Sequence, residues 1–423
     1  MKSSLNIFLN KKILVYGLGK SGLATFNFLK KKSKVFTYDD NKKSLISYQD
    51  LKKIKFDYII ISPGINIKKC KLSKFLKTYS KKIFTDLDVF FSFFKNDCIT
   101  VTGTNGKSTT CQLLYEILLK QKFDVRLVGN IGNPILSSIK IKPKTIFVVE
   151  ASSYQLEYSK IFKSKFAVLL NITPDHIERH RTIKRYVSAK FKLIKNQSKQ
   201  CLCFLKKGDF LIEKELKVTK IKSKIIKVDT LKYNKILYYL KNEYFLTEAN
   251  KENLLFVLAI ADKLKLNKKL LFDTIQNFKG LKYRQQIVHK KSNLIIINDS
   301  KSTSFSSSLG ILKTNSNIYW LLGGINKKSD KFNLPKKYHY NIKAFIFGKK
   351  RNFFNNQLKG KIQTENFHNL KDAFKKVVNL TKRQRSIKKT ILFSPSAASF
   401  DSFKNFEDRG QYFNKLIKKY LNE

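Results

Sequence analysis

The chain has 423 residues, of which 42% are hydrophobic, so we expect two or three domains with ordinary cores. The 86 lysines and arginines outnumber 30 acidic residues, giving a net charge of +56, but they are spread over the whole sequence among abundant Asn, Ile, Phe and Tyr. This spread is typical of a compositional bias and argues against a specific nucleic acid partner, although the positive field attracts anionic substrates. No run approaches the roughly 18 apolar residues of a membrane span, so no membrane insertion is expected. The first residues do not read as a signal peptide, and five cysteines without C-x-x-C spacing indicate a reducing, cytoplasmic location.

Residues 12–62 predict a strand, a helix and two further strands. The first strand, 12–16, precedes Gly17-Leu18-Gly19-Lys20-Ser21-Gly22, and a helical stretch covers 23–29. The next strand ends at Asp39-Asp40 and the third at Pro63-Gly64. A G-x-G-x-x-G loop with an acid about 20 residues further on is the fingerprint of a dinucleotide site. Taken alone the pattern predicts an NAD enzyme, but the same loop accepts any nucleotide diphosphate.

A phosphate-binding loop is predicted in residues 99–110, ITVTGTNGKSTT. A short apolar strand leads into a glycine loop, a Lys-Ser pair and a helix. In such a loop backbone N–H groups approach the phosphates, Lys107 meets the β- and γ-phosphates, and the Ser108 hydroxyl can ligate Mg²⁺. Val101 stands where the full motif has its first glycine. A simple turn opening a helix is the alternative, but no turn requires the Lys-Ser pair, so the segment predicts a nucleoside triphosphate site.

The rest of the chain alternates predicted strands and helices. Helices are predicted at 182–196, 250–264 and 405–421, and residues 200–245 read as short strands and turns. The predicted strands are 98–102, 145–150, 166–171, 293–299, 317–324, 343–348 and 389–395. This alternation predicts an α/β protein with parallel sheets throughout.

Polar residues follow many of these strands, where ligands bind in parallel sheets. Glu150 ends one strand and could bind a Mg²⁺ that bridges the phosphates. Asp175-His176, 298–303, 323–327 and 394–401 follow others, which predicts a site between domains. His176 and His180 have helical spacing, but Glu178 has the wrong offset for a zinc-binding H-E-x-x-H helix. We therefore expect His180 at the surface or beside the site.

Several of these segments together resemble the Mur ligases, ATP-dependent amide ligases of peptidoglycan precursor synthesis. The matching motifs are GTNGKST at 103–109, GNIG at 129–132, EASSYQLE at 150–157, NITPDH at 171–176, SAK at 188–190, NDSKST at 298–303 and LLGG at 321–324. The resemblance implies a Rossmann-like UDP-sugar domain at 1–92, a P-loop ATP domain at 93–280 and a Rossmann-like amino-acid domain at 281–423. Residues 394–410, SPSAASFDSFKNFEDRG, are most similar to members that add D-glutamate. The implied substrates are UDP-N-acetylmuramoyl-L-alanine, D-glutamate and ATP, and the implied assembly is a monomer.

The resemblance also implies the site residues. The UDP-sugar contacts would be Gly19, Lys20, Ser21, Asp39, Asp40, Gly64 and Asn130. The ATP contacts would be Gly103, Thr104, Asn105, Gly106, Lys107, Ser108, Thr109, Asn250, Asn253, Arg284 and Asp299. The D-glutamate contacts would be Thr303, Lys327, Ser399, Phe400 and Phe406. Ser108 and Glu150 would hold one Mg²⁺, and His176 with a carbamylated Lys190 a second.

The implied reaction activates the L-alanyl carboxylate as an acyl phosphate, which the amine of D-glutamate then attacks. Lys107, His176 and Lys190 are the implied catalytic residues, and Lys107 with two Mg²⁺ offsets the repulsion between the anions. The chain has Ala249-Asn250 where the family usually has His-Asn, and Lys282-Tyr283 where Pro-His is usual.

Other functions explain less of the sequence. A Rossmann oxidoreductase would leave Lys107, Glu150 and Lys190 without a role, and a nucleic-acid-binding protein would explain only the charge. Another Mur ligase or a folylpolyglutamate synthase would not account for residues 394–410.

Overall fold

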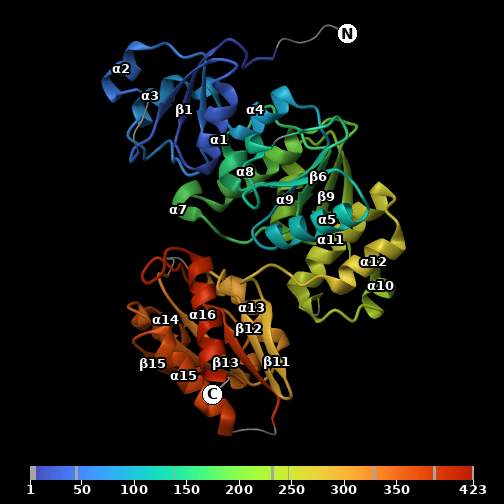
Figure 1. Ribbon diagram of the computed structural model, residues 1–423, viewed down its shortest axis with the longest axis vertical. Coiled ribbons are helices and arrows are strands. Elements are labelled where there is room, and N and C mark those ends of the chain that lie inside the picture. Colours follow the sequence, from blue (N-terminus) through green and yellow to red (C-terminus); the bar gives the residue numbers. More distant parts are fainter. Residues whose placement is uncertain are drawn as a thin grey trace. The chain divides into compact units, whose positions relative to one another are not determined.

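A computed structural model describes residues 6–42, 46–138, 140–229, 233–245, 247–326, 330–383 and 387–421. The chain forms two compact units, the first made of residues 1–240 and 252–276 and the second of 241–251 and 277–423 (Figure 1). Unit 1 contains two sheets and unit 2 a third, which confirms the predicted α/β class. The predicted domain boundaries at residues 92 and 280 stay a prediction.

The first sheet of unit 1 has four parallel strands in the order β2-β1-β3-β4. Its β1 is buried on both faces, with Leu14 in the same cluster as Leu51 of α2 and Val15 in the same cluster as Leu29 of α1. A strand covered on both sides reads as a continuous apolar run, which explains why it was predicted. The elements are β1 (Lys12–Tyr16), α1 (Lys20–Leu29), β2 (Lys34–Tyr38), α2 (Tyr48–Lys53), β3 (Tyr58–Ile61), α3 (Ser73–Thr78), η1 (Ser80–Lys82), β4 (Ile83–Phe84) and α4 (Asp86–Phe93).

The second sheet of unit 1 has six parallel strands in the order β10-β9-β8-β5-β7-β6. The chain leaves β5 for β6 and β7 on one side of it, and the connection after β7 then crosses to β8 on the other side. The carboxyl end of β5 therefore lies at a topological switch point, where α/β sheets bind ligands. The strands are β5 (Cys98–Thr102), β6 (Val125–Gly129), β7 (Ile146–Glu150), β8 (Phe166–Leu169), β9 (Leu202–Lys206) and β10 (Lys224–Val228). The helices are α5 (Lys107–Lys120), η2 (Ile135–Ser137), α6 (Ser153–Tyr158), α7 (Ile177–His180), α8 (Ile183–Lys195), α9 (Phe210–Val218), α10 (Asn234–Tyr238), η4 (Glu243–Phe245), α11 (Glu248–Leu264) and α12 (Lys268–Asn277), of which η4 and the first residues of α11 belong to unit 2.

Two predictions for this region were incomplete. Residues 200–245, expected to hold only strands and turns, also form α9 and α10. Ile212 is buried in the core, and Leu211 and Leu216 pack against it partly buried, so a short apolar stripe was present in the sequence and was overlooked. The prediction also omitted β6, in which Val125 and Val128 are buried but the other three residues are only partly buried.

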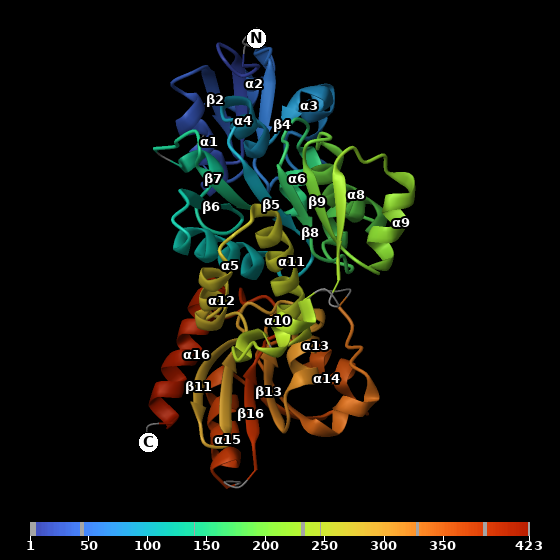
Figure 2. The same ribbon diagram turned by 90° about the vertical axis from the view of Figure 1, so that its right-hand side faces the viewer.

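The sheet of unit 2 has the order β11-β12-β16-β13-β14-β15. Helices α13 and α14 cover one face around Trp320, and α15 and α16 cover the other around Phe393 (Figure 2). The elements are β11 (Gln286–Lys291), β12 (Leu294–Asn298), α13 (Phe305–Thr314), β13 (Ile318–Gly323), η5 (Lys336–Asn341), β14 (Ile342–Phe347), α14 (Arg351–Leu358), β15 (Gln363–Phe367), α15 (Leu370–Arg383), β16 (Lys389–Phe393) and α16 (Phe406–Leu421).

The edges of this sheet differ from the prediction. β11 pairs antiparallel with β12, so the expectation of parallel strands throughout is wrong here. Both edge strands, β11 and β15, were missed because their sequences, QIVHKK and QTENF, leave most side chains partly or fully exposed.

Two further findings concern the whole described chain. All five cysteines are free. Among the helices in the described ranges, we find none with the length and apolar character needed to cross a bilayer.

Candidate active site

The predicted phosphate loop lies at the carboxyl end of β5. Gly103 and Gly106 have φ values of +153° and +84°, a region that favours glycine. A Cβ on Gly106 would lie 2.0 Å from Oδ1 of Asn253, so glycine is also required for the approach of α11. The loop is held by Asn171, which follows β8 and accepts the Thr104 N–H at its carbonyl oxygen (2.9 Å) and the Asn105 N–H at Oδ1 (3.0 Å).

Lys107 begins α5 and folds back over the loop. Its Nζ donates to the carbonyl oxygens of Gly103 (2.9 Å) and Thr104 (2.7 Å). The ammonium group and the amino end of the helix therefore place positive charge on the same loop, which suits a phosphate ligand.

Glu150, at the end of β7, meets two predicted site residues. Its side chain is buried, Ser108 Oγ donates to Oε2 (2.6 Å), and Asn130 Nδ2 donates to Oε1 (2.7 Å). The predicted metal ligands Ser108 and Glu150 are thus in contact. Asn130, which is expected to contact the UDP sugar, also donates to the carboxylate of Glu150.

The donor set around Glu150 limits how a cation could be held. Hydroxyl and carboxylate oxygens are ligands that Mg²⁺ prefers. Within the described ranges, no cluster of three His, Cys, Asp or Glu side chains is arranged to hold a metal. A cation here would need oxygens from phosphate groups or from a modified side chain.

Lys190 on α8 lies against the same loop. Its side chain is only 1% exposed, Nζ donates to the Gly103 carbonyl (2.6 Å), and Nζ is 4.7 Å from the centre of the Tyr186 ring. Burial, together with the nearby charge of Lys107, lowers the pKa of Lys190 well below its ordinary value, although Asp175 and Glu150 act in the opposite direction. The structure therefore destabilises the ammonium form of Lys190 relative to the neutral amine.

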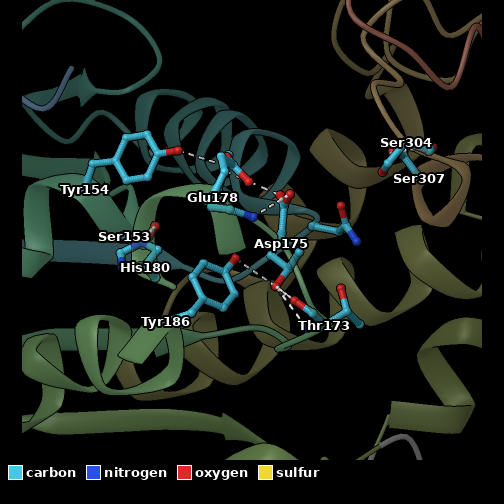
Figure 3. A network of polar contacts seen from close by, with 12 residues as sticks. Ser153, Tyr154, Thr173, Asp175, Glu178, His180, Tyr186, Ser304 and Ser307 are labelled. Carbon is cyan, nitrogen blue, oxygen red and sulfur yellow. Dashed lines mark hydrogen bonds and ion pairs between the residues drawn. The ribbon is translucent and has the colours of Figure 1, made fainter. Parts of the chain in front are cut away.

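His176 precedes α7 with a φ of +55°. Its Nδ1 lies 2.9 Å from the hydroxyl of Tyr154, and its ring is also close to Asp175 (3.4 Å) and Glu178 (3.5 Å). Figure 3 labels these three neighbours. The ring is thus oriented by side chains from α6 and from the loop after β8.

His180 is buried, which excludes the surface position and leaves the other expected place, beside the site. Its Nε2 lies 3.0 Å from Ser153 Oγ, and its ring packs beside Tyr154 and Tyr186. Burial lowers its pKa. Its short helix packs this ring inward, which the sequence spacing alone did not indicate.

Tyr186 connects α8 to the phosphate loop. Its hydroxyl lies 3.1 Å from Thr104 Oγ1, which donates to the Thr173 carbonyl (3.1 Å) and accepts the Thr173 N–H (3.0 Å). Our sequence analysis missed Tyr154, Asn171 and Tyr186. The first two lie inside recognised motifs, and Tyr186 stands one helical turn before Lys190. The sequence therefore contained a signal for each of the three.

The glycine loop of the first sheet has the close packing that its motif requires. A Cβ on Gly22 would lie 1.8 Å from the Gly17 carbonyl oxygen, so α1 packs directly on the loop. A Cβ on Gly19 or Gly64 would meet no atom within 4 Å, so both face open space. Lys20 and Ser21 begin α1, at the loop.

The two acids after β2 are bonded to the protein. Asp39 accepts the N–H groups of Leu18 (2.5 Å) and Asn41 (2.9 Å), and Asp40 accepts the Tyr16 hydroxyl (2.8 Å). Burial acts to raise the pKa of Asp39, but the N–H donors outweigh it and the pKa is lowered.

Of the remaining predicted ATP contacts, Thr109 on α5 and Asn253 belong to unit 1, and Asn250, Arg284 and Asp299 belong to unit 2. Asn250 Nδ2 donates to the Tyr244 carbonyl (2.8 Å) and to Gln285 Oε1 (3.2 Å). Asp299 accepts the Gln285 N–H (3.1 Å) and the Ser394 hydroxyl (2.8 Å). Burial raises the pKa of Asp299 to about 7, although the charge of Arg284 opposes the shift.

Arg409 joins the loops that carry three of the predicted D-glutamate residues, Thr303, Ser399 and Phe400. This buried guanidinium on α16 donates to the carbonyls of Ser300 (2.7 Å), after β12, and Ala397 (2.9 Å), after β16. Ser300 Oγ donates in turn to the backbone oxygen of Phe406 (2.9 Å). Of the predicted residues, Ser399 is buried, Thr303 and Phe406 are half-buried, and Phe400 is 71% exposed. Lys327 lies outside the described residues.

Comparisons with known proteins identify the family to which this sequence is similar. Residues 101–269 match the Mur ligase middle domain. The chain is 36% identical to the UDP-N-acetylmuramoylalanine--D-glutamate ligase of Buchnera aphidicola, covering 98% of this chain and 99% of the relative. It is 32% identical to the enzyme of that name from Rickettsia felis, covering 99% of each.

Solved structures share the fold at lower identity. The Thermotoga maritima MurF ligase, crystallised with ADP, has a TM-score of 0.58 at 16% identity, covering 99% of this chain and 100% of that one. The MurC ligase of the same organism has a TM-score of 0.56 at 15% identity, covering 98% and 100%. The chain belongs to the Mur ligase family.

Proposed function

We propose that this protein joins D-glutamate to UDP-N-acetylmuramoyl-L-alanine with ATP, forming UDP-N-acetylmuramoyl-L-alanyl-D-glutamate, ADP and phosphate for peptidoglycan synthesis. The observation that carries the proposal is the phosphate loop with Lys107 folded over it and Glu150 and Lys190 buried against it. A nicotinamide-dependent oxidoreductase would leave Lys107, Glu150 and Lys190 without a role. The full-length relatives named for this reaction support the choice of amino acid.

The reaction proceeds in two steps. The carboxylate of the L-alanyl group attacks the γ-phosphorus of ATP, and the bond to the β-γ bridging oxygen breaks to release ADP. The amine of D-glutamate then attacks the acyl phosphate carbon, expels phosphate and loses a proton. Lys107 and the amino end of α5 stabilise the charge on the transferring group, since both face the loop that would hold it.

The residues beside the loop fit Mg²⁺. Ser108 and Glu150 would hold one ion, and His176 with a carbamylated Lys190 a second; Mg²⁺ would neutralise charge on the phosphates. The Lys190 position suits this modification, because Nζ is enclosed beside Glu150 and Lys107 and the structure disfavours its ammonium form. A carbamate supplies oxygen ligands, whereas an ammonium group would repel the cation.

The other substrates are assigned by family motif. Gly19, Lys20, Ser21, Asp39, Asp40, Gly64 and Asn130 would contact the UDP sugar, although Asp39, Asp40 and Asn130 also have protein partners. The ATP contacts would include Thr109, Asn250, Asn253, Arg284 and Asp299, and the D-glutamate contacts Thr303, Lys327, Ser399, Phe400 and Phe406. We assign the enzyme to the cytoplasm as a monomer with domains at 1–92, 93–280 and 281–423.

A coupled assay tests this function. With ATP, MgCl₂ and UDP-N-acetylmuramoyl-L-alanine, ADP and phosphate should form only when D-glutamate is added. L-glutamate, L-lysine and diaminopimelate serve as matched alternatives. Equal turnover with any of these would refute the assignment of D-glutamate.

A further inference from the structure

A chain of hydrogen bonds runs from α11 to the phosphate loop. Glu252, in the second turn of α11, accepts Asn171 Nδ2 at Oε1 (3.1 Å) and Lys206 Nζ at Oε2 (2.5 Å). Lys206 is the last residue of β9. Asn171 accepts the Asn105 N–H at Oδ1 (3.0 Å), so the carboxylate lies one side chain away from the phosphate loop.

Glu252 fixes which way the Asn171 amide faces, together with the Asn105 carbonyl oxygen, which also accepts Asn171 Nδ2 (3.4 Å). A carboxylate only accepts hydrogen bonds, so the amide must turn its NH₂ group toward Glu252 and its oxygen toward the Asn105 N–H. If the amide turned over, two N–H donors would face each other at Asn105. The same asparagine accepts the Thr104 N–H at its backbone oxygen, so its placement controls two successive loop residues.

Lys206 neutralises the charge of this carboxylate. The side chains of Glu252 and Lys206 are 22% and 38% exposed, so their attraction adds little stability. An unpaired carboxylate near a loop that binds a polyanion would repel that ligand. Because the ammonium group of Lys206 cancels this repulsion, Glu252 can accept the hydrogen bond from Asn171 without weakening the binding of an anion at the loop.

We propose that Glu252 is a positioning residue for the nucleotide, which orients Asn171 and so fixes the backbone of Thr104 and Asn105, with Lys206 cancelling its charge. The proposal rests on the proposed binding of ATP at this loop. The adjacent Asn253 packs against Gly106, so two successive residues of α11 shape the loop.

The experiment uses the whole enzyme and compares KM values for its three substrates. Glu252→Ala should raise the KM for ATP about tenfold, as expected for one lost hydrogen bond to a charged group, with the KM for D-glutamate and for the UDP sugar unchanged. Glu252→Gln should recover most of this loss, since its amide oxygen still accepts from Asn171. Asp229→Asn is the matched control, because it removes the neighbouring pair Lys207–Asp229 (2.6 Å) and should leave all KM values unchanged.

A charge test separates positioning from a structural salt bridge. Lys206→Ala should raise the KM for ATP by leaving Glu252 unpaired, and adding Glu252→Gln to it should lower that KM again. A merely structural bridge would not be repaired by a second substitution. An unchanged KM for ATP in Glu252→Ala, equal changes in all three KM values, or a double variant worse than Lys206→Ala would overturn the proposal.

Direct titration with ADP tests the hydrogen-bond chain from Glu252 to the phosphate loop, which we call the relay, independently of the reaction. If the wild-type chain binds ADP but lacks turnover dependent on D-glutamate, the proposed function fails, and weaker ADP binding by Glu252→Ala still supports the relay. Equal ADP affinity in wild type and Glu252→Ala overturns it.

Discussion

Asp88 offers a test of how the first two sheets of unit 1 are joined. It is the third residue of α4, after the first sheet, and its side chain is fully buried. Its Oδ2 accepts the N–H (2.9 Å) and hydroxyl (3.1 Å) of Thr85, which caps α4. Its Oδ1 accepts four donors from the segment after α6: Ser159 Oγ (3.0 Å), Lys160 N (2.9 Å), Ile161 N (2.8 Å) and Phe162 N (3.0 Å).

Asp88→Ala should destabilise unit 1 by about 5 kcal/mol. Both Thr85 and Phe162 are buried, and each N–H left without an acceptor costs about 2 kcal/mol. The buried Ser159 hydroxyl also loses its acceptor, which adds about 1 kcal/mol. Asp88→Asn keeps one acceptor oxygen but turns an NH₂ group toward one set of donors, so a smaller loss of about 2 to 3 kcal/mol is expected.

Urea unfolding monitored by hydrogen exchange of unit 1 measures these losses, because a protein with two units need not unfold in one step. Asp50→Asn is the matched control, since Asp50 is the third residue of α2 and is exposed. It should change stability by less than about 0.5 kcal/mol. A loss below about 1 kcal/mol in Asp88→Ala, or an Asp88→Asn variant as stable as wild type, would refute the reasoning.

The remaining predictions concern activity, pH and charge. Lys107→Ala should lower kcat roughly a hundredfold, since a preorganised charge on the transferring phosphoryl group is worth about 3 kcal/mol; near-normal turnover would place ATP elsewhere. Lys190→Ala should nearly abolish activity, and short-chain carboxylic acids should partly restore it by supplying the carbamate oxygens; full activity without them would contradict the carbamate. Burial raises the pKa of Asp299 from 3.8 to about 7, so the folded state binds its proton more tightly and stability falls as pH rises from 4 to 7. Relative to Asp299→Asn, the wild type should lose about 4 kcal/mol across that range in unfolding measurements, and parallel curves would show that Asp299 does not titrate this way. Nucleic acid should bind without sequence preference and dissociate by about 0.2 M salt in filter binding, while ligase activity persists; sequence-selective binding at physiological salt would contradict a compositional origin of the charge.

Local chemistry made part of this protein predictable. The phosphate loop needs glycine at positive φ and a Lys-Ser pair at the start of a helix, and both requirements are visible in residues 103–108. Strands buried on both faces, such as β1 and β13, were found because their apolar runs are continuous, and β5 was found because its residues are mostly β-branched. The edge strands β11 and β15 were not, because exposed strands lack that signal.

The partners of the polar side chains were decided only by the tertiary structure. Asn130 donates to Glu150 across 20 residues, Asp88 accepts the Phe162 N–H across 74, and Asn171 reaches Glu252 across 81. Nothing in the local sequence marks such pairs, since a carboxylate or amide that faces solvent and one that holds a loop are the same residue type. Burial makes the difference, because a polar group removed from water must find a partner, and which group is within reach depends on how distant strands and helices pack.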